Sequence, residues 1–352
     1  MKKLDANLKK HLWAGTVIPA HPLALHPDRS IDEEHQRLLT QYYIASGAGG
    51  IAVAVHSTQF EIREPEINLF EPVLKWASEE VDKAKLHRPF LKIAGICGPT
   101  EQAVQEANIA LKYGYDIGLL SMGGLAGWTE KAILDRVRAI AAIMPVFGFY
   151  LQPSVGGRIF SYSFWQEFVE IDNVVAIKCA SFNRYQTLDV MRALANSSRH
   201  DQIAMYTGND DNIVNDLMTT YEFPVNGNIV KLDFKGGLLG HWAVWTQKAV
   251  MLLEEIKRYK QHPDNSTAKF LLSKAIAVTD SNAAFFDPAH AFHGCIPGLH
   301  EVLVRQGLMK GAWCLNPNEQ LSPGQKEEIE RIYNDYPDLN DDAFVQNFLR
   351  SK

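Results

Sequence analysis

A lysine inside an apolar strand is the first chemically informative feature of the sequence. Lys178 follows Val174, Val175, Ala176 and Ile177, a run typical of parallel strands that are covered on both faces. Val174, Ala176 and Lys178 share one face by the two-residue period of a strand. Burial disfavours an ammonium group and lowers its pKa, which makes the amine a nucleophile. The alternative is a lysine at a strand end that reaches back to water.

A tyrosine at the end of the preceding strand is the second feature. Tyr150 opens a Tyr-x-x-Pro motif that ends at Pro153. Because neighbouring strands lie about 4.8 Å apart, we expect the side chains of Tyr150 and Lys178 to converge on one carbonyl carbon. A phenol at this point could transfer protons to and from the reacting groups. The alternative is a core tyrosine with its hydroxyl at the rim.

Short apolar runs alternate with longer amphipathic segments along the chain. The predicted strands are Gly15–Pro19, Ile51–Ser57, Leu91–Cys97, Ile117–Ser121, Val146–Leu151, Val174–Ala180, Ile203–Thr207 and Asn228–Phe234. The predicted helices are Asp32–Ala45, Thr100–Tyr113, Trp128–Ile143, Ser163–Ile171, Thr187–Ala195 and Asp211–Tyr221, followed by His241–Lys260, Thr267–Val278, Gly298–Gly307 and Pro323–Tyr333. This alternation predicts an α/β fold, a (β/α)₈ barrel over residues 12–238, with a C-terminal helical extension packed on it over residues 239–352. A doubly wound sheet is the alternative, but no GxGxxG loop follows an early strand.

Composition excludes several classes of protein. The 352 residues are 46% hydrophobic and 22% charged, with a net charge of −6 and no basic cluster, which argues against nucleic acid as a partner. No apolar run is long enough to span a membrane, and the charged N-terminus does not look like a signal peptide. The four cysteines lack CxxC spacing and are expected to be buried free thiols. A cytoplasmic location follows as an expectation.

Together the two motifs carry a resemblance to a known family. The Tyr150-x-x-Pro153 motif, followed by the Val-x-x-Ile-Lys strand of Lys178, resembles the dihydrodipicolinate synthase / N-acetylneuraminate lyase family. The segments that fall into register with it include 15–19, 94–97 and 207–211. The resemblance implies a class I aldolase mechanism, in which Lys178 forms a Schiff base with pyruvate or another 2-oxo acid, including sugar-derived ones, and Tyr150 shuttles protons. It implies no metal or other cofactor, a small-molecule substrate, and a homodimer or homotetramer.

The resemblance also suggests which residues bind the substrate. The family binds the oxo-acid carboxylate through a hydroxyl pair in a Gly-Thr-Thr-Gly-Glu loop after the second strand. The loop here reads His-Ser-Thr-Gln-Phe, so Ser57 and Thr58 are the closest match, with His56 and Ser57 as the other register. His56 is also open to a structural role at the rim. After Gly208, Asp210 matches an acidic residue that binds substrate hydroxyls in the sialic-acid lyases, although a helix start also favours an acidic residue there.

Three departures from the family argue against dihydrodipicolinate synthase activity. Val155 stands where those synthases have the arginine that holds the second substrate's carboxylate. The loop at 121–128 lacks the tyrosine that the synthases lend across a dimer interface, and the Gly-Thr-Thr-Gly-Glu loop is changed. We therefore expect a lyase or aldolase of a different substrate. The alternatives are a hydro-lyase that uses the same imine and a family member that binds a ligand without catalysis.

Overall fold

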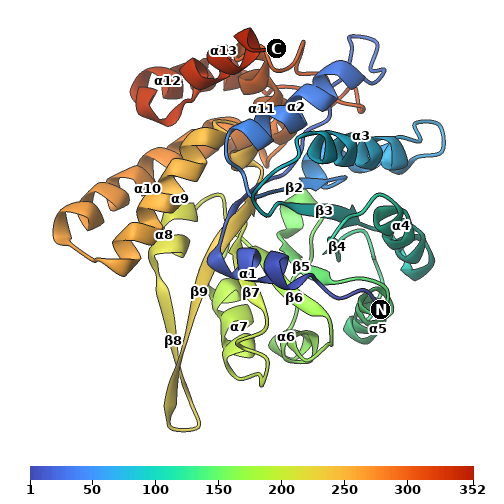
Figure 1. Cartoon of the computed structure of the whole chain (residues 1–352), viewed down its shortest axis with the longest axis vertical. Coiled ribbons are helices and arrows are strands. Elements are labelled where there is room, and N and C mark those ends of the chain that lie inside the picture. The colour runs from blue at the N-terminus through green and yellow to red at the C-terminus, as the bar shows by residue number, and fades with distance from the viewer.

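The computed structural model describes residues 1–352 and shows a nearly closed barrel of parallel strands (Figure 1). The strands follow one another around the barrel in the order β1-β9-β7-β6-β5-β4-β3-β2, and a bridge between Ala20 and Ala52 joins β1 to β2. Their bounds are β1 Val17–Pro19, β2 Gly50–Val53, β3 Leu91–Ile96, β4 Ile117–Ser121, β5 Val146–Leu151, β6 Val174–Ala180, β7 Ala204–Thr207 and β9 Asn228–Leu239. The predicted (β/α)₈ architecture is confirmed.

Helices alternate with the strands and surround the barrel (Figure 1). They are α2 Glu33–Ala45, α3 Phe70–Lys83, α4 Thr100–Lys112, α5 Glu130–Ala141, α6 Tyr162–Val169, α7 Arg184–Ala195, α8 Ile213–Met218 and α9 Thr246–Gln261. Side-chain caps start several of them where the sequence changes from strand to helix, such as Asp32 before α2 and Asn183 before α7. Helix α3 was not predicted from the sequence, and two short 3₁₀ turns, His56–Thr58 and Phe60–Arg63, lie between it and β2.

Two hydrophobic cores result from this arrangement. The outer core lies between strands and helices and joins 82 buried residues. The inner core fills the barrel with 17 buried residues, among them Ala176, Phe147 and Phe149. Val174 belongs to the outer core and Ala176 to the inner one. The prediction that Val174 shares a face with Lys178 is therefore wrong.

The eighth barrel strand differs from its prediction. The segment Asn228–Asp233 pairs antiparallel with β8, Thr220–Val225, and forms a hairpin that projects from the barrel (Figure 1). Only the part from Phe234 onward pairs with β7 and β1. Gly236 and Gly237 lie within this part of the strand. A larger residue would not fit at position 236, because its Cβ would come within 2.3 Å of the Thr16 carbonyl oxygen. The glycines allow close approach of the neighbouring strands.

The ends of the chain cover the two ends of the barrel. Helix α1, Ala6–Ala14, lies across the amino ends of the strands, where His11 Nε2 is 2.9 Å from the Gly49 carbonyl oxygen and Tyr206 donates to the Leu12 carbonyl oxygen. Helices α10 Asn265–Phe286, α11 Cys295–Arg305, α12 Gln325–Asp335 and α13 Asp342–Arg350 follow the barrel. None of the helices is both long and apolar enough to cross a membrane. All four cysteines are free, and Cys97 is half-buried rather than buried as expected.

Candidate active site

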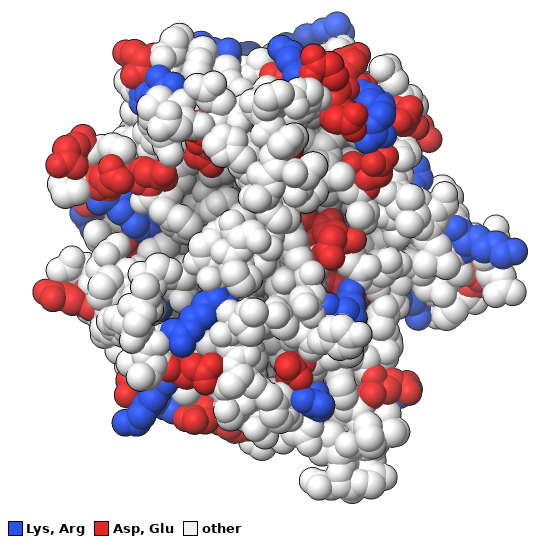
Figure 2. Space-filling view, turned by 180° about the vertical axis from the view of Figure 1, so that it is seen from behind, with Lys and Arg blue, Asp and Glu red and all other residues white.

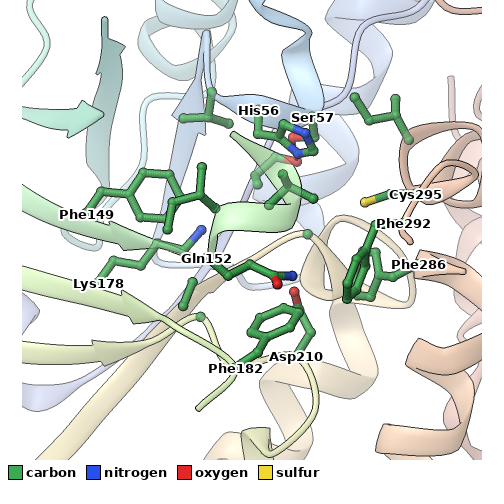
Figure 3. Close-up of a pocket in the computed structure, with 18 of the residues that line it drawn as sticks. His56, Ser57, Phe149, Gln152, Lys178, Phe182, Asp210, Phe286, Phe292 and Cys295 are labelled. Atoms are coloured by element: carbon green, nitrogen blue, oxygen red, sulfur yellow. Dashed lines mark hydrogen bonds between the residues drawn. The ribbon is translucent and has the colours of Figure 1, made fainter. Parts of the chain in front are cut away.

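Lys178 ends in a cavity at the carboxyl end of the barrel (Figure 3). It lies two residues before the end of β6, and only 8% of it is exposed. Its Nζ sits 4.3 Å from the centre of the Phe149 ring, and no carboxylate approaches it within 4.0 Å. Burial lowers the pKa of Lys178, and the charge of Asp210 partly opposes this effect. The amine is therefore held in the place and in the environment that a Schiff-base nucleophile needs.

A glycine makes room for this lysine. A Cβ on Gly208, directly after β7, would lie 2.4 Å from Lys178 Cε, 3.1 Å from Lys178 Cγ and 2.9 Å from Ala180 Cβ. Real Cβ atoms do not approach other atoms this closely, so no other residue type fits without moving the lysine. Gly208, which the resemblance to the family suggests as a substrate-binding residue, thus lines the cavity and shapes the path of the lysine side chain.

The structure does not bring Tyr150 to Lys178. Phe149 is the register partner of Lys178, whereas Tyr150 is paired with Cys179 and faces the outer core. The Tyr150 ring packs against Trp165 with centroids 4.9 Å apart, and it does not line the cavity. Burial there raises its pKa to about 12. The predicted convergence of the two side chains is wrong.

A one-residue irregularity between β5 and β6 explains this correction. Val146 pairs with Val174, but Phe147 already pairs with Ala176, so β6 carries one extra residue. An uninterrupted register would have placed Tyr150 opposite Lys178, as the sequence predicted. A bulge of one residue exchanges the two faces of a strand, and here it exchanges the phenol for the phenyl ring of Phe149.

The loop after β2 places two of its three predicted residues at the cavity. His56 and Ser57 line it, in a short 3₁₀ turn from His56 to Thr58. Thr58 is fully buried beneath them, where its hydroxyl donates to the His21 carbonyl oxygen (2.6 Å) and accepts from the Val55 backbone N–H (3.2 Å). Of the two predicted pairs, His56-Ser57 has both members at the cavity, whereas Thr58 of the favoured pair Ser57-Thr58 does not line it.

The chemical state of these two groups is set by their surroundings. The Ser57 hydroxyl donates to the carbonyl oxygen of Ala20 at 2.9 Å, so its hydrogen is already used. Burial, together with the charge of Lys178, lowers the pKa of His56 to about 4. His56 is thus a neutral imidazole with one N–H to donate.

Asp210 lies on the side of the cavity opposite Ser57 (Figure 3). Its Oδ1 is buried and has no hydrogen-bond partner. Burial raises the pKa of the Asp210 carboxyl, Lys178 opposes this, and Asp211 adds to it. A carboxyl of this kind can hold or release a proton near neutral pH.

A buried network fixes the loop that carries Asp210. The Asp216 carboxylate, fully buried, accepts hydrogen bonds from Thr207 Oγ1 (2.7 Å) and Asn209 Nδ2 (2.8 Å). Arg184 forms an ion pair with the same carboxylate at 2.6 Å. From α10, Asn282 Nδ2 donates to the Asp210 carbonyl oxygen at 2.6 Å. Residues before and after Asp210 are therefore both held, which orients its side chain.

Gln152 is a cavity residue that the sequence analysis missed. It follows β5 directly, is 7% exposed, and its buried Nε2 has no hydrogen-bond partner. Figure 3 shows its amide in the cavity, between His56 and Asp210. The available signal was its position, since it is a polar side chain at the carboxyl end of an apolar barrel strand.

The C-terminal segment lines the cavity with apolar side chains. Phe286 at the end of α10, Phe292 in the following loop and Cys295 of α11 lie opposite the lysine strand (Figure 3), and Ile296 and Leu299 of α11 also line the cavity. The remaining volume is about 70 Å³. Helix α1 is in front in Figure 1, so Figure 2 looks from behind onto the side of the strands' carboxyl ends. In this view uncharged residues cover most of the middle of the face, with an acidic cluster to the right of the centre and a few charged residues below it.

The residues at the cavity do not form a metal site. The one group of His, Cys, Asp and Glu side chains with converging ligand atoms is Asp32, Glu34 and His35, at the start of α2. The Lys310 ammonium lies 2.9 Å from Asp32 Oδ2 and supplies a positive charge there. This group belongs to the surroundings of a helix start and not to the cavity.

Comparisons with known proteins agree with this fold. No protein-family model and no curated protein matches the sequence. Among solved structures, dihydrodipicolinate synthase from Bacillus clausii is similar with a TM-score of 0.73 at 19% identity, covering 94% of this chain and 99% of that one. N-acetylneuraminate lyase from Fusobacterium nucleatum complexed with pyruvate gives 0.71 at 17% identity, covering 93% and 99%. Dihydrodipicolinate synthase from Oceanobacillus iheyensis gives 0.71 at 18%, covering 94% and 99%. The chain has the fold of the dihydrodipicolinate synthase / N-acetylneuraminate lyase family, as its motifs predict.

Proposed function

We propose that this protein is a lyase that forms a Schiff base between Lys178 and a small 2-oxo acid. The observation that carries the proposal is the buried Lys178 amine, which ends over the Phe149 ring in a small, mostly apolar cavity at the carboxyl end of the barrel and forms no ion pair. A lysine in such a place costs stability, because its charged form is poorly solvated. Such a cost is expected where the neutral amine acts as a nucleophile, as it does in imine formation.

Two polar groups of the cavity suit the carboxylate of the oxo acid. Gln152 offers an unpartnered amide N–H, and neutral His56 offers a ring N–H. Both lie on the cavity wall with Lys178, so a carboxylate held by them would place the adjacent ketone carbon near the amine (Figure 3). Ser57 also lines this wall, but its hydroxyl donates its hydrogen bond to the Ala20 carbonyl oxygen. Ser57 is therefore assigned a supporting role.

The proton transfers fall to Asp210 in this proposal. Imine formation needs an acid that protonates the departing hydroxyl of the carbinolamine, and aldol cleavage needs a base that takes a hydroxyl proton. Tyr150 faces the outer core, and Phe149, which occupies the corresponding place beside Lys178, has no hydroxyl. Asp210 is the only carboxyl group at the cavity, and its raised pKa suits both transfers. The imine part of the proposal stands independently of this assignment.

Borohydride trapping with pyruvate tests the proposal directly. Reduction should attach pyruvate covalently to the wild-type chain, and peptide mapping should place the adduct on Lys178. Lys178→Ala should abolish the adduct. Lys274→Ala is the matched control, since that lysine also lies over an aromatic ring, 5.5 Å from the Phe270 centroid, but away from the cavity. If none of a panel of 2-oxo acids gives an adduct, imine chemistry is refuted, and a ligand-binding member of the fold remains.

A further inference from the structure

The cavity also carries information about the part of the substrate beyond the oxo acid. We propose that this part is a short apolar chain, so that the substrate is a 4-hydroxy-2-oxo acid with a small alkyl group. Its cleavage would give pyruvate and a small aliphatic aldehyde. The inference rests on the proposed imine at Lys178, and it concerns a subsite that Lys178 does not form.

The apolar part of the cavity wall offers no partner for a polar chain. It consists of side chains from the loops after β5, β6 and α10, from the end of α10 and from α11: Val155, Phe182, Phe292, Phe286, Ile296 and Leu299. No arginine and no second lysine lines the cavity. A second carboxylate or a row of hydroxyls would be buried there without hydrogen bonds, which is costly.

The polar groups of the cavity are already assigned to the reacting end. Gln152 and His56 face the carboxylate, Lys178 the ketone carbon, and Asp210 the hydroxyl on the fourth carbon. The Ser57 hydroxyl donates to a backbone carbonyl. Burial raises the pKa of the Cys295 thiol, which remains a weakly polar neutral group. A sugar chain would therefore compete for groups that the reaction itself requires.

The volume limits the length of the chain. The cavity holds about 70 Å³, whereas an apolar cavity that binds benzene has about 150 Å³. The Phe182 and Phe292 rings meet edge to face with centroids 5.8 Å apart and narrow the space. Because the oxo acid also has to fit there, the small volume favours a chain of one or two carbon atoms beyond the hydroxyl-bearing carbon over a longer chain or an aromatic ring.

The cleavage step balances with these groups alone. In the Lys178 imine of the 4-hydroxy-2-oxo acid, the bond between the third and fourth carbons breaks. Its electron pair moves into the iminium and forms an enamine, while the hydroxyl proton passes to Asp210 and the aldehyde leaves. Protonation of the third carbon and hydrolysis of the imine by water release pyruvate and restore the amine. No oxidant or reductant is needed.

Propanal and glycolaldehyde provide a size-matched test, because they differ by a methyl group in place of a hydroxyl. Condensation of each with pyruvate is measured on the wild-type protein, alongside borohydride trapping with pyruvate alone. We expect kcat/KM for propanal to exceed that for glycolaldehyde by about 10- to 100-fold, the range over which an apolar pocket discriminates against an added hydroxyl. If pyruvate is trapped but glycolaldehyde is used equally well or better, the apolar subsite is refuted while the imine proposal stands. Failure of trapping would refute both.

A variant of the wall gives a second measurement. Phe292 has a left-handed backbone (φ 66°), which asparagine tolerates better than most residues, so Phe292→Asn introduces a polar partner at low backbone cost. Phe292→Leu is the apolar control. The propanal-to-glycolaldehyde ratio should fall by roughly tenfold in the asparagine variant relative to the leucine variant. An unchanged ratio would show that this wall does not contact the aldehyde. If the variants do not fold, the wild-type ratio decides.

Discussion

The replacement of Gly208 by alanine tests whether this glycine makes room for the Lys178 side chain, because it adds a single methyl group beside the lysine. The added methyl group would lie 2.4 Å from Lys178 Cε and 2.9 Å from Ala180 Cβ. Ordinary contacts between carbon atoms are about 3.5–4.0 Å, so the lysine side chain has to move by roughly 1 Å or more. The flexible lysine can move, whereas Ala180 belongs to β6 and cannot move without the barrel.

The two consequences differ in size. Overpacking of a close-packed interior costs about 1–3 kcal/mol of unfolding free energy, so Gly208→Ala should still fold. A misplacement of about 1 Å in a reacting group can cost about 100-fold in rate. We therefore expect the rate of imine formation with pyruvate to fall by roughly 10- to 100-fold, a larger effect than the modest loss of stability suggests.

The assay is the time course of borohydride trapping at saturating pyruvate, together with urea unfolding of the same samples. Gly118→Ala is the matched control, because Gly118 is also a barrel residue without a left-handed backbone. Its added Cβ would meet only the Ile96 and Met144 side chains, at 3.1 and 3.3 Å. The control should trap pyruvate at nearly the wild-type rate. A folded Gly208→Ala protein that also traps at the wild-type rate would refute the argument that this glycine sets the position of the amine.

Four further predictions concern the charge of Lys178 and the assigned roles. Because burial lowers the pKa of Lys178 below its ordinary 10.5 and the proposed acid Asp210 loses its proton as the pH rises, the trapping rate should rise with pH and stop rising below pH 10.5, and a rate that still rises beyond it would contradict this. Lys178→Met should raise the unfolding free energy at neutral pH by about 1–3 kcal/mol, since one pKa unit corresponds to about 1.4 kcal/mol, and urea melts should show the gain shrink as the pH rises and vanish above pH 10.5, where the lysine becomes neutral in both states. Tyr150→Phe should change kcat less than about threefold, whereas Asp210→Asn should lower it by about 10²–10⁴-fold, the usual effect of a lost acid-base group; the opposite order would return the role to Tyr150. Aspartate semialdehyde should be a poor partner for pyruvate because Val155 offers its carboxylate no bidentate contact, and efficient condensation would show that another group holds it.

The pattern of the sequence determined the architecture of this protein. Apolar runs such as Val146–Leu151 and Val174–Ala180, which alternate with amphipathic segments, predicted a parallel barrel, and both runs match β5 and β6 residue for residue. The pattern also placed Lys178 near the carboxyl end of its strand. The strands follow from the local periodicity of apolar residues, and the unusual position of Lys178 follows from its charge in an apolar run. Both can be read from neighbouring residues in the sequence.

The predicted bounds of the eighth barrel strand were wrong, because two neighbouring segments of the chain could both pair with other strands. Residues 228–234 were predicted as the eighth strand, but the segment up to Asp233 forms a hairpin with β8. The barrel strand uses the following residues, including two glycines that permit close backbone approach. Sequence periodicity indicates that a strand is present, but it does not tell which strand is its partner.

Only the tertiary structure decided which side chains meet at the site. A single extra residue in β6 exchanged Tyr150 for Phe149 beside Lys178, because the side-chain period of two makes a shift of one residue a change of face. The burial of Thr58 beneath the loop after β2 was likewise settled by a hydrogen bond to the His21 carbonyl. The apolar wall comes from residues 286–299, far from Lys178 in the chain, and no local pattern links the two. Residue types revealed which chemistry was available, and the register and packing of the folded chain selected the groups that can carry it out.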